Sequence, residues 1–228
     1  TGSPLVDIIL DRAGQKGTGR WAVIEAQMMG VPATAIEAAV AARSLSALKS
    51  EREAAERLYG ALPVTFEKGS QAELIGKLER ALLAGKIAAY AQGFAVMRAA
   101  SGEFGWNLPM ATIARIWRAG CIIRSQFLDT IAAAFEADAT VANLLVAPSF
   151  AATMKEAHSA LREVVSKAAL AGSPAPALSS ALAYFDGYRQ ARGTANLIQG
   201  QRDFFGAHGF ERIDAKGEHH GPWGGVRL

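Results

Sequence analysis

One long helical pattern decides the fold of this chain: residues 70–100, SQAELIGKLERALLAGKIAAYAQGFAVMRAA. Large apolar residues recur along it at helical spacing from Leu74 to Phe94, which predicts a single long helix. Gly85 and Gly93 interrupt the pattern, and because a glycine has no Cβ, each would let a second helix approach closely. We expect this helix to be central in the domain.

Shorter helical patterns flank the long one on both sides. Alanine, leucine and isoleucine dominate the chain, and alternating runs of β-branched residues are few, which favours helix over strand. The expected helices cover about residues 4–14, 21–29, 31–48, 113–120, 123–135, 149–170, 175–192 and 195–205, with a break at Leu62-Pro63. The sequence therefore predicts an all-α, multi-helix bundle with long central helices and almost no sheet.

Length and composition limit the class of protein. The chain has 228 residues, of which 50% are hydrophobic, so it can bury a sizeable core. Its net charge is +3, from 24 basic and 21 acidic residues, which is too even to indicate nucleic-acid binding. No apolar run approaches the roughly 20 residues that cross a bilayer, and no signal pattern opens the chain. We expect a soluble, cytoplasmic protein with no membrane partner.

The chain offers little for metal binding or acid–base catalysis. Its single cysteine, Cys121, excludes an internal disulfide and stands beside Ile122 and Ile123, which favours a buried, inert thiol over a nucleophile. Glu51 and Glu53 have the pattern of a solvated helix face. The histidines include no pair four positions apart: they are His158, His208, His219 and His220. We therefore expect no metal site, and no catalytic residue is assigned in this chain.

A glycine-rich loop, AGQKGTGRW at residues 13–21, has the composition of an anion site. Its glycines would allow backbone N–H groups to converge on a ligand, and Thr18 could cap the helix that follows. Lys16 and Arg20 would add full positive charges. The loop lacks both the Walker spacing and a GxGxxG after a strand, so the alternative is that it is only a turn.

A second cationic pair, Arg202 and His208, lies six positions apart near the C-terminus. On an unbroken helix the two side chains would point about 120° apart, so a shared ligand requires the helix to end between them, as Gly206 would make it do. Guanidinium and imidazole could together bind a phosphate. The alternative is that Arg202 only neutralises a helix C-terminus.

The last segment, residues 208–228, has no periodicity and cannot build a core of its own. It nevertheless carries Phe210, Ile213 and Trp223, which would be better buried against another subunit. We expect a helical domain at 1–207 and a tail at 208–228 that is exchanged between the subunits of a homodimer. The alternative is a mobile terminus.

Several collinear motifs resemble the C-terminal domain of decarboxylating 6-phosphogluconate dehydrogenase, and together they cover nearly the whole chain. They are PLVD at 4–7, AGQKGTG at 13–19, ARSLS at 42–46, IARIWR at 113–118, GCIIR at 120–124, SSALAY at 179–184, NLIQ at 196–199 and QRDFFGAH at 201–208. Gly209-Phe210 and the glycine-rich end at 221–228 depart from the family pattern.

The resemblance implies an enzyme of the pentose phosphate pathway and of gluconate utilisation. It would oxidise 6-phosphogluconate with NADP, decarboxylate the 3-keto intermediate and release ribulose 5-phosphate and carbon dioxide. By similarity, Lys16, Thr18 and Arg43 would line the substrate pocket of one subunit. Arg202 and His208 would reach the substrate phosphate in the partner subunit.

The family's N-terminal nucleotide-binding domain, its dinucleotide fingerprint and its catalytic lysine and glutamate have no counterpart in these 228 residues. This stretch alone is therefore expected to be inactive, with NADP bound mainly by that other domain. Two alternatives stay open: a non-catalytic helical dimerisation module, and the helical domain of another β-hydroxyacid dehydrogenase. The Arg202 to His208 segment argues against the second, because that enzyme would act on a small unphosphorylated acid.

Overall fold

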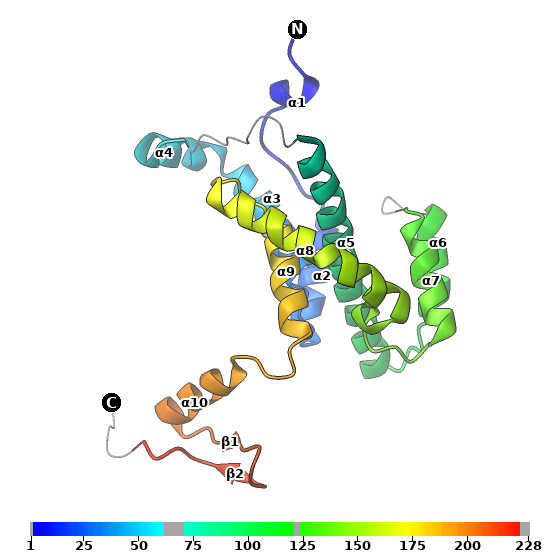
Figure 1. The fold of residues 1–228 in the computed structure, drawn as a ribbon, viewed down its shortest axis with the longest axis vertical. Coiled ribbons are helices and arrows are strands. Elements are labelled where there is room, and N and C mark those ends of the chain that lie inside the picture. Colours follow the sequence, from blue (N-terminus) through cyan, green and yellow to red (C-terminus); the bar gives the residue numbers. More distant parts are fainter. Residues whose placement is uncertain (1, 62–70, 121–123, 224–228) are drawn as a thin grey trace. The chain divides into compact units, whose positions relative to one another are not determined.

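The computed structural model describes residues 2–61, 71–120 and 124–223, and most of them are helical (Figure 1). The helices are α1 (Leu5–Ile8), α2 (Thr18–Met28), α3 (Thr34–Ala47), α4 (Lys49–Tyr59), α5 (Gln71–Glu103), α6 (Met110–Gly120), α7 (Phe127–Ala137), the 3-10 turn η1 (Leu144–Val146), α8 (Pro148–Leu170), α9 (Pro176–Tyr188) and α10 (Ala195–Gly206). Two short strands follow, β1 (Phe210–Glu211) and β2 (Glu218–His219). The predicted all-α class is confirmed.

The chain folds as two compact units, residues 1–185 and 186–228. The predicted division into a domain and a tail after residue 207 is a functional one and stays a prediction. In the first unit the predicted long helix is present as α5, which packs against α8 (Figure 1). Apolar side chains that are almost completely buried fill the space between α5, α7, η1 and α8: Ile87, Phe94, Leu128, Ile131, Leu144, Phe150, Met154 and Leu161.

Gly85 allows α9 to approach α5 closely. A Cβ at Gly85 would lie 2.6 Å from Cδ2 of Leu178, a distance that real side chains do not tolerate. At Gly93 the nearest neighbour of such a Cβ would be Cδ1 of Ile36, at an ordinary 4.0 Å. The prediction of close helix packing is thus confirmed for Gly85 and is wrong for Gly93.

A buried glutamine fixes the start of α3. Gln92 of α5 is completely buried, and its Oε1 accepts a hydrogen bond of 3.0 Å from the backbone N–H of Ala35. Its Nε2 donates to Oγ1 of Thr34 at 3.3 Å. The residue that precedes α3 provides no side-chain cap. The buried side chain of Gln92 therefore supplies the cap from the core of the domain.

The structure differs from the sequence prediction near the N-terminus. The first helix ends at Ile8 rather than near Gly14, and Ile9 is already extended, with φ −77° and ψ 130°. The backbone of this segment bonds to side chains of α3 and α4 in place of its own helical partners. A fourth helix, α4, adds to the three predicted in the first sixty residues.

Two expectations lie outside the described residues: the break at Leu62-Pro63 and the buried thiol of Cys121. Within the described part of the chain, no helix combines the length and apolar character needed to span a membrane.

Candidate functional site

The glycine-rich loop begins α2 through a glycine. Gly17 is the N-cap, is buried, and has a φ of +107°, a conformation that favours glycine. Thr18 is the first residue of α2 rather than its N-cap, and no side chain of the described residues caps this helix, so the prediction that Thr18 caps it is wrong. The Thr18 side chain is exposed instead. It is therefore available to a ligand at the positive end of α2.

Side chains of α3 hold this loop in place. The hydrogen bonds run from the Ala13 N–H to Ser46 Oγ (2.9 Å), from Gln15 Nε2 to Ser44 Oγ (3.0 Å), and from the Arg43 guanidinium to the Gly14 carbonyl. Arg52 of α4 adds an ion pair with Asp11 and a hydrogen bond of 3.1 Å to the carbonyl of the same residue. The motifs at 13–19 and 42–46 are thus joined directly.

Two of the predicted binding cations are brought to this one region. Arg43 contacts the carbonyl of Gly14, two residues before Lys16. Both cationic side chains are exposed, so both can meet a charged ligand. Asp11 is the acidic group paired here: the hydrogen bond and charge of Arg52 hold the pKa of the Asp11 carboxyl below its usual value.

The second cationic pair is brought together at the end of α10. The helix ends at Gly206, as predicted, and Ala207 takes the left-handed conformation with φ +50°. Gly206 acts differently from the prediction, because it remains helical and makes room for a ring. A Cβ on Gly206 would lie 3.0 Å from Nε2 of His208. The imidazole therefore lies over the last turn of the helix.

Arg202 and His208 line one hollow of about 360 Å³ on the second unit. Its other lining residues are Ile198, Gln201, Phe205 and Gly206. The guanidinium of Arg202 donates to Oε1 of Gln199 at 3.0 Å, and Nε2 of Gln199 donates to the carbonyl of Gly209 at 2.6 Å. Gln199 thereby orients the cation, a role that the sequence motif did not indicate.

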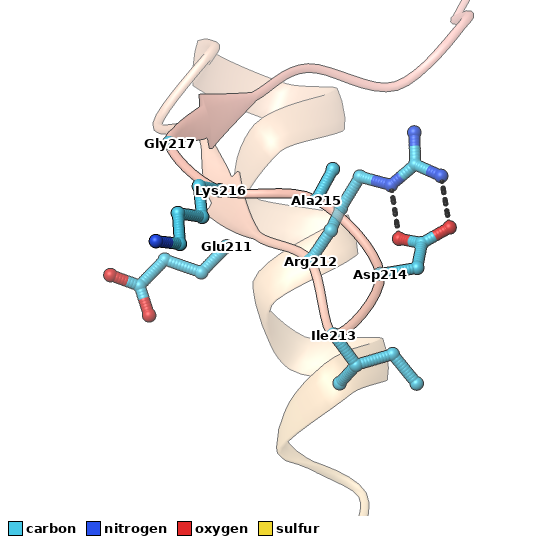
Figure 2. A pocket seen from close by; sticks show the side chains of 7 residues that line it. All are labelled: Glu211, Arg212, Ile213, Asp214, Ala215, Lys216 and Gly217. Atoms are coloured by element: carbon cyan, nitrogen blue, oxygen red, sulfur yellow. Dashed lines mark hydrogen bonds and ion pairs between the residues drawn. The ribbon is translucent and has the colours of Figure 1, made fainter.

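A third element of the second unit is the hairpin of β1 and β2, which pair antiparallel with Phe210 opposite His219. The loop between them encloses a hollow of about 470 Å³ lined by residues 211–217 (Figure 2). Arg212 is already paired there with Asp214 through bonds of 2.8 and 2.6 Å (Figure 2). Because its arginine is neutralised and no predicted site residue lines it, we do not assign this hollow to the ligand.

A match to a known protein family decides which family the chain belongs to. The family model for the C-terminal domain of 6-phosphogluconate dehydrogenase matches residues 1–223. The chain belongs to this family. It corresponds to the C-terminal part of a 6-phosphogluconate dehydrogenase, and the alternative of another β-hydroxyacid dehydrogenase is set aside.

Individual relatives agree with this assignment. The decarboxylating 6-phosphogluconate dehydrogenase of Bacillus licheniformis is 47% identical over 224 residues, which are 98% of this chain and 48% of that protein. An NAD(+)-dependent 6-phosphogluconate dehydrogenase from Bacillus subtilis is 46% identical over 224 residues, again 98% of this chain and 48% of that protein. The chain spans about half the length of the relatives that it matches.

A solved 6-phosphogluconate dehydrogenase has the same fold. The enzyme of Plasmodium falciparum is 38% identical to this chain and superposes with a TM-score of 0.92, over 98% of this chain and 48% of that one. It has been described in its apo form and in complexes with its cofactor NADP+ and its substrate 6-phosphogluconate.

The departure of this chain from the 6-phosphogluconate dehydrogenase pattern at Gly209 has a local cause. Gly209 is buried and has a φ of +71°, and a Cβ there would collide with the side chain of Glu218. A residue with a side chain at this position would be strained in the observed turn.

The meeting of the two cationic regions, Lys16 with Arg43 and Arg202 with His208, in one pocket stays a prediction.

Proposed function

We propose that this chain is the substrate-binding and dimer-forming half of an NADP-dependent 6-phosphogluconate dehydrogenase. The enzyme would oxidise and decarboxylate 6-phosphogluconate to ribulose 5-phosphate in the cytoplasmic pentose phosphate pathway. Lys16, Thr18 and Arg43 would bind the substrate in one subunit, and Arg202 and His208 would reach its phosphate from the partner. The observation that carries this proposal is the hollow shared by Arg202 and His208.

The chemistry of the substrate fits these side chains. 6-Phosphogluconate carries a phosphate at one end and a carboxylate at the other, so a binding site needs several fixed cations. A guanidinium forms paired hydrogen bonds with phosphate oxygens, and the imidazole adds a further donor. The residues of this chain would bind and orient the substrate. No proton transfer is assigned to them.

The cofactor belongs to another part of such an enzyme. NADP would accept the hydride when bound, but the described residues contain no strand followed by a glycine-rich turn and a helix. The two strands that they do form are each two residues long. No residue of this chain is therefore assigned to the dinucleotide.

Exposed apolar side chains support the proposed homodimer. In the second unit Leu197, Phe205 and Ile213 are 66%, 71% and 92% exposed. In the first unit apolar side chains of α2 are also left in water, with Trp21 58% and Met28 74% exposed. Apolar surface of this extent is typical of a surface that another protein covers. We assign it to a second copy of the chain.

Calorimetric titration of the 228-residue protein with 6-phosphogluconate, together with sedimentation analysis, tests the proposal. We expect a dimer that binds the ligand. Arg202→Ala should weaken binding by about 10- to 100-fold, because a charge-assisted hydrogen bond contributes about 1.5–3 kcal/mol. Arg212→Ala is the matched control, since Arg212 pairs with Asp214 in the hairpin loop, and it should leave the affinity unchanged.

Two outcomes would contradict the proposal. A dimer that binds no 6-phosphogluconate would favour a non-catalytic dimerisation module instead. Equal affinity of the wild-type and Arg202→Ala proteins would remove Arg202 from the phosphate site. In a complete dehydrogenase that carries this domain, Arg202→Ala should raise KM for 6-phosphogluconate far more than KM for NADP.

A further inference from the structure

One carboxylate holds the second unit together. Asp203 belongs to α10, and its side chain is completely buried between this helix and the segment that follows β2. Its Oδ1 accepts hydrogen bonds from the N–H of Gly209 at 2.8 Å and from Nδ1 of His220 at 2.6 Å. Its Oδ2 accepts from the N–H of Gly221 at 2.8 Å and from the indole Nε1–H of Trp223 at 2.6 Å.

These partners come from two separate segments of the chain. Gly209 belongs to the turn directly after α10, whereas His220, Gly221 and Trp223 follow β2. A carboxylate only accepts hydrogen bonds, so the His220 nitrogen that faces it carries a hydrogen. Burial would by itself raise the pKa of Asp203. The hydrogen bonds from Gly221, Trp223, His220 and Gly209 outweigh burial and hold this pKa well below its usual range.

In the sequence, Asp203 and one of its partners, Gly209, each lie next to a predicted phosphate-binding residue. Arg202 directly precedes Asp203 on α10, and His208 directly precedes Gly209, whose N–H the carboxylate holds. The main-chain carbonyl of Asp203 also accepts the N–H of Ala207 at 2.8 Å, which fixes the left-handed turn between Arg202 and His208. The side chain and the backbone of Asp203 therefore both set where His208 lies.

We propose that Asp203 is the positioning residue of the phosphate hollow, holding the turn at 207–209 and the tail at 220–223 so that His208 faces Arg202. The proposal rests on the proposed function for the identity of the ligand. Asp203 does not touch the ligand, because its side chain is buried and both of its oxygens already have two donors each. A substrate-binding region of this kind would be formed before the substrate arrives.

The test is Asp203→Asn, which keeps the size of the side chain but replaces one acceptor oxygen by an N–H₂ group. In ¹⁵N–¹H spectra, the Trp223 indole signal should shift and exchange with solvent about tenfold faster or more. Binding of 6-phosphogluconate should weaken by about tenfold. In a complete dehydrogenase with this domain, KM for 6-phosphogluconate should rise by a similar factor, with KM for NADP and kcat changed less than about twofold.

Two further variants complete the design. Asp214→Asn is the matched control, because Asp214 lies in the same unit but is exposed and pairs with Arg212 of the hairpin loop. It should change neither the indole signal nor the affinity. Trp223→Phe keeps an aromatic ring at this position and removes one of the donors to Asp203. It should weaken binding by about threefold, and it keeps the test valid if the asparagine variant leaves the tail unfolded.

Each outcome decides a different claim. Wild-type affinity in Asp203→Asn and Trp223→Phe would overturn the positioning role and leave the proposed function intact. A wild-type protein that binds no 6-phosphogluconate would defeat the proposed function. In that case the positioning role of Asp203 would be tested by the ring signals of His208 and the indole signal of Trp223. If these signals are unchanged in Asp203→Asn, the inference is overturned.

Discussion

At Gly206 the missing side chain decides where His208 lies. Gly206→Ala would place a Cβ 3.0 Å from the imidazole and push the ring away from the hollow. Alanine is also the better helix former by about 1 kcal/mol. We expect α10 to become no less stable while the affinity for 6-phosphogluconate falls by about tenfold, measured by calorimetry and thermal melting.

The control for this variant lies on the same helix. A Cβ at Gly200 would meet no atom within 4 Å among the residues that the structure describes. Gly200→Ala should therefore raise the stability of α10 and leave ligand affinity unchanged. Unaltered affinity in Gly206→Ala would contradict the placement of His208.

Asp203 also gives the second unit a defined response to acid. Because its pKa in the folded chain lies below that of the unfolded chain, its stabilising effect is fully present above about pH 4 and is lost as the pH falls further. We expect the Trp223 indole signal to persist from neutral pH to about pH 4 and to disappear only in stronger acid. In Asp203→Asn this dependence should be absent, and a wild-type signal already lost at pH 5 would contradict the assignment.

At the scale of elements, the contact between α5 and α9 is specific to one glycine. Gly85→Ala would force a Cβ to 2.6 Å from Leu178, and overpacking of this kind costs about 1–3 kcal/mol. Gly76→Ala on the same helix meets no atom of the described residues within 4 Å and should stabilise the helix by up to about 1 kcal/mol. Chemical denaturation of both variants measures the difference. Equal stabilities would show that α9 yields without cost.

The cap of α3 by Gln92 makes a second prediction for an element. Gln92→Leu would leave the buried N–H of Ala35 without its acceptor, at a cost of about 1–3 kcal/mol. Exposed Gln71, on the same helix, is the control, and Gln71→Leu should change the free energy of unfolding by less than about 0.5 kcal/mol. Because Arg43 of α3 holds the glycine-rich loop at residues 13–21, the Gln92 variant should also loosen that loop.

The helices could be predicted from periodicity because the apolar residues of α5, α8 and α10 recur at helical spacing. The extended course after Ile8 could not be predicted, because distant side chains of α3 and α4 hold it. Ser46 bonds to Ala13, and Arg52 bonds to Asp11, across more than thirty positions. Arg43 bonds to the Gly14 carbonyl. The pairing of Arg202 with His208 followed from helix geometry. The roles of Gln199 and Asp203 did not, since their partners are backbone groups and tail residues that no local pattern connects.

For the whole molecule, burial divides the stability unevenly between the two units. The hydrophobic core that joins α5, α7, α8 and α9 consists of residues up to Phe185. The second unit is held instead by the Asp203 hydrogen bonds and by ring contacts such as Phe204 against Trp223, with centroids 5.8 Å apart. The first unit should therefore fold without the second.

A chain that ends at Gly193 tests this division. It retains α1–α9 and the whole of that core, and it lacks Arg202, Asp203 and His208. We expect a cooperative thermal transition within about 2–4 °C of that of the longer chain, which corresponds to a change of about 1 kcal/mol at this size. Binding of 6-phosphogluconate should fall below detection, because the phosphate-binding side chains are gone. A shortened chain that binds the substrate normally would place the phosphate site wholly within the first unit, and one that melts without cooperativity would show that its core depends on α10 and the tail.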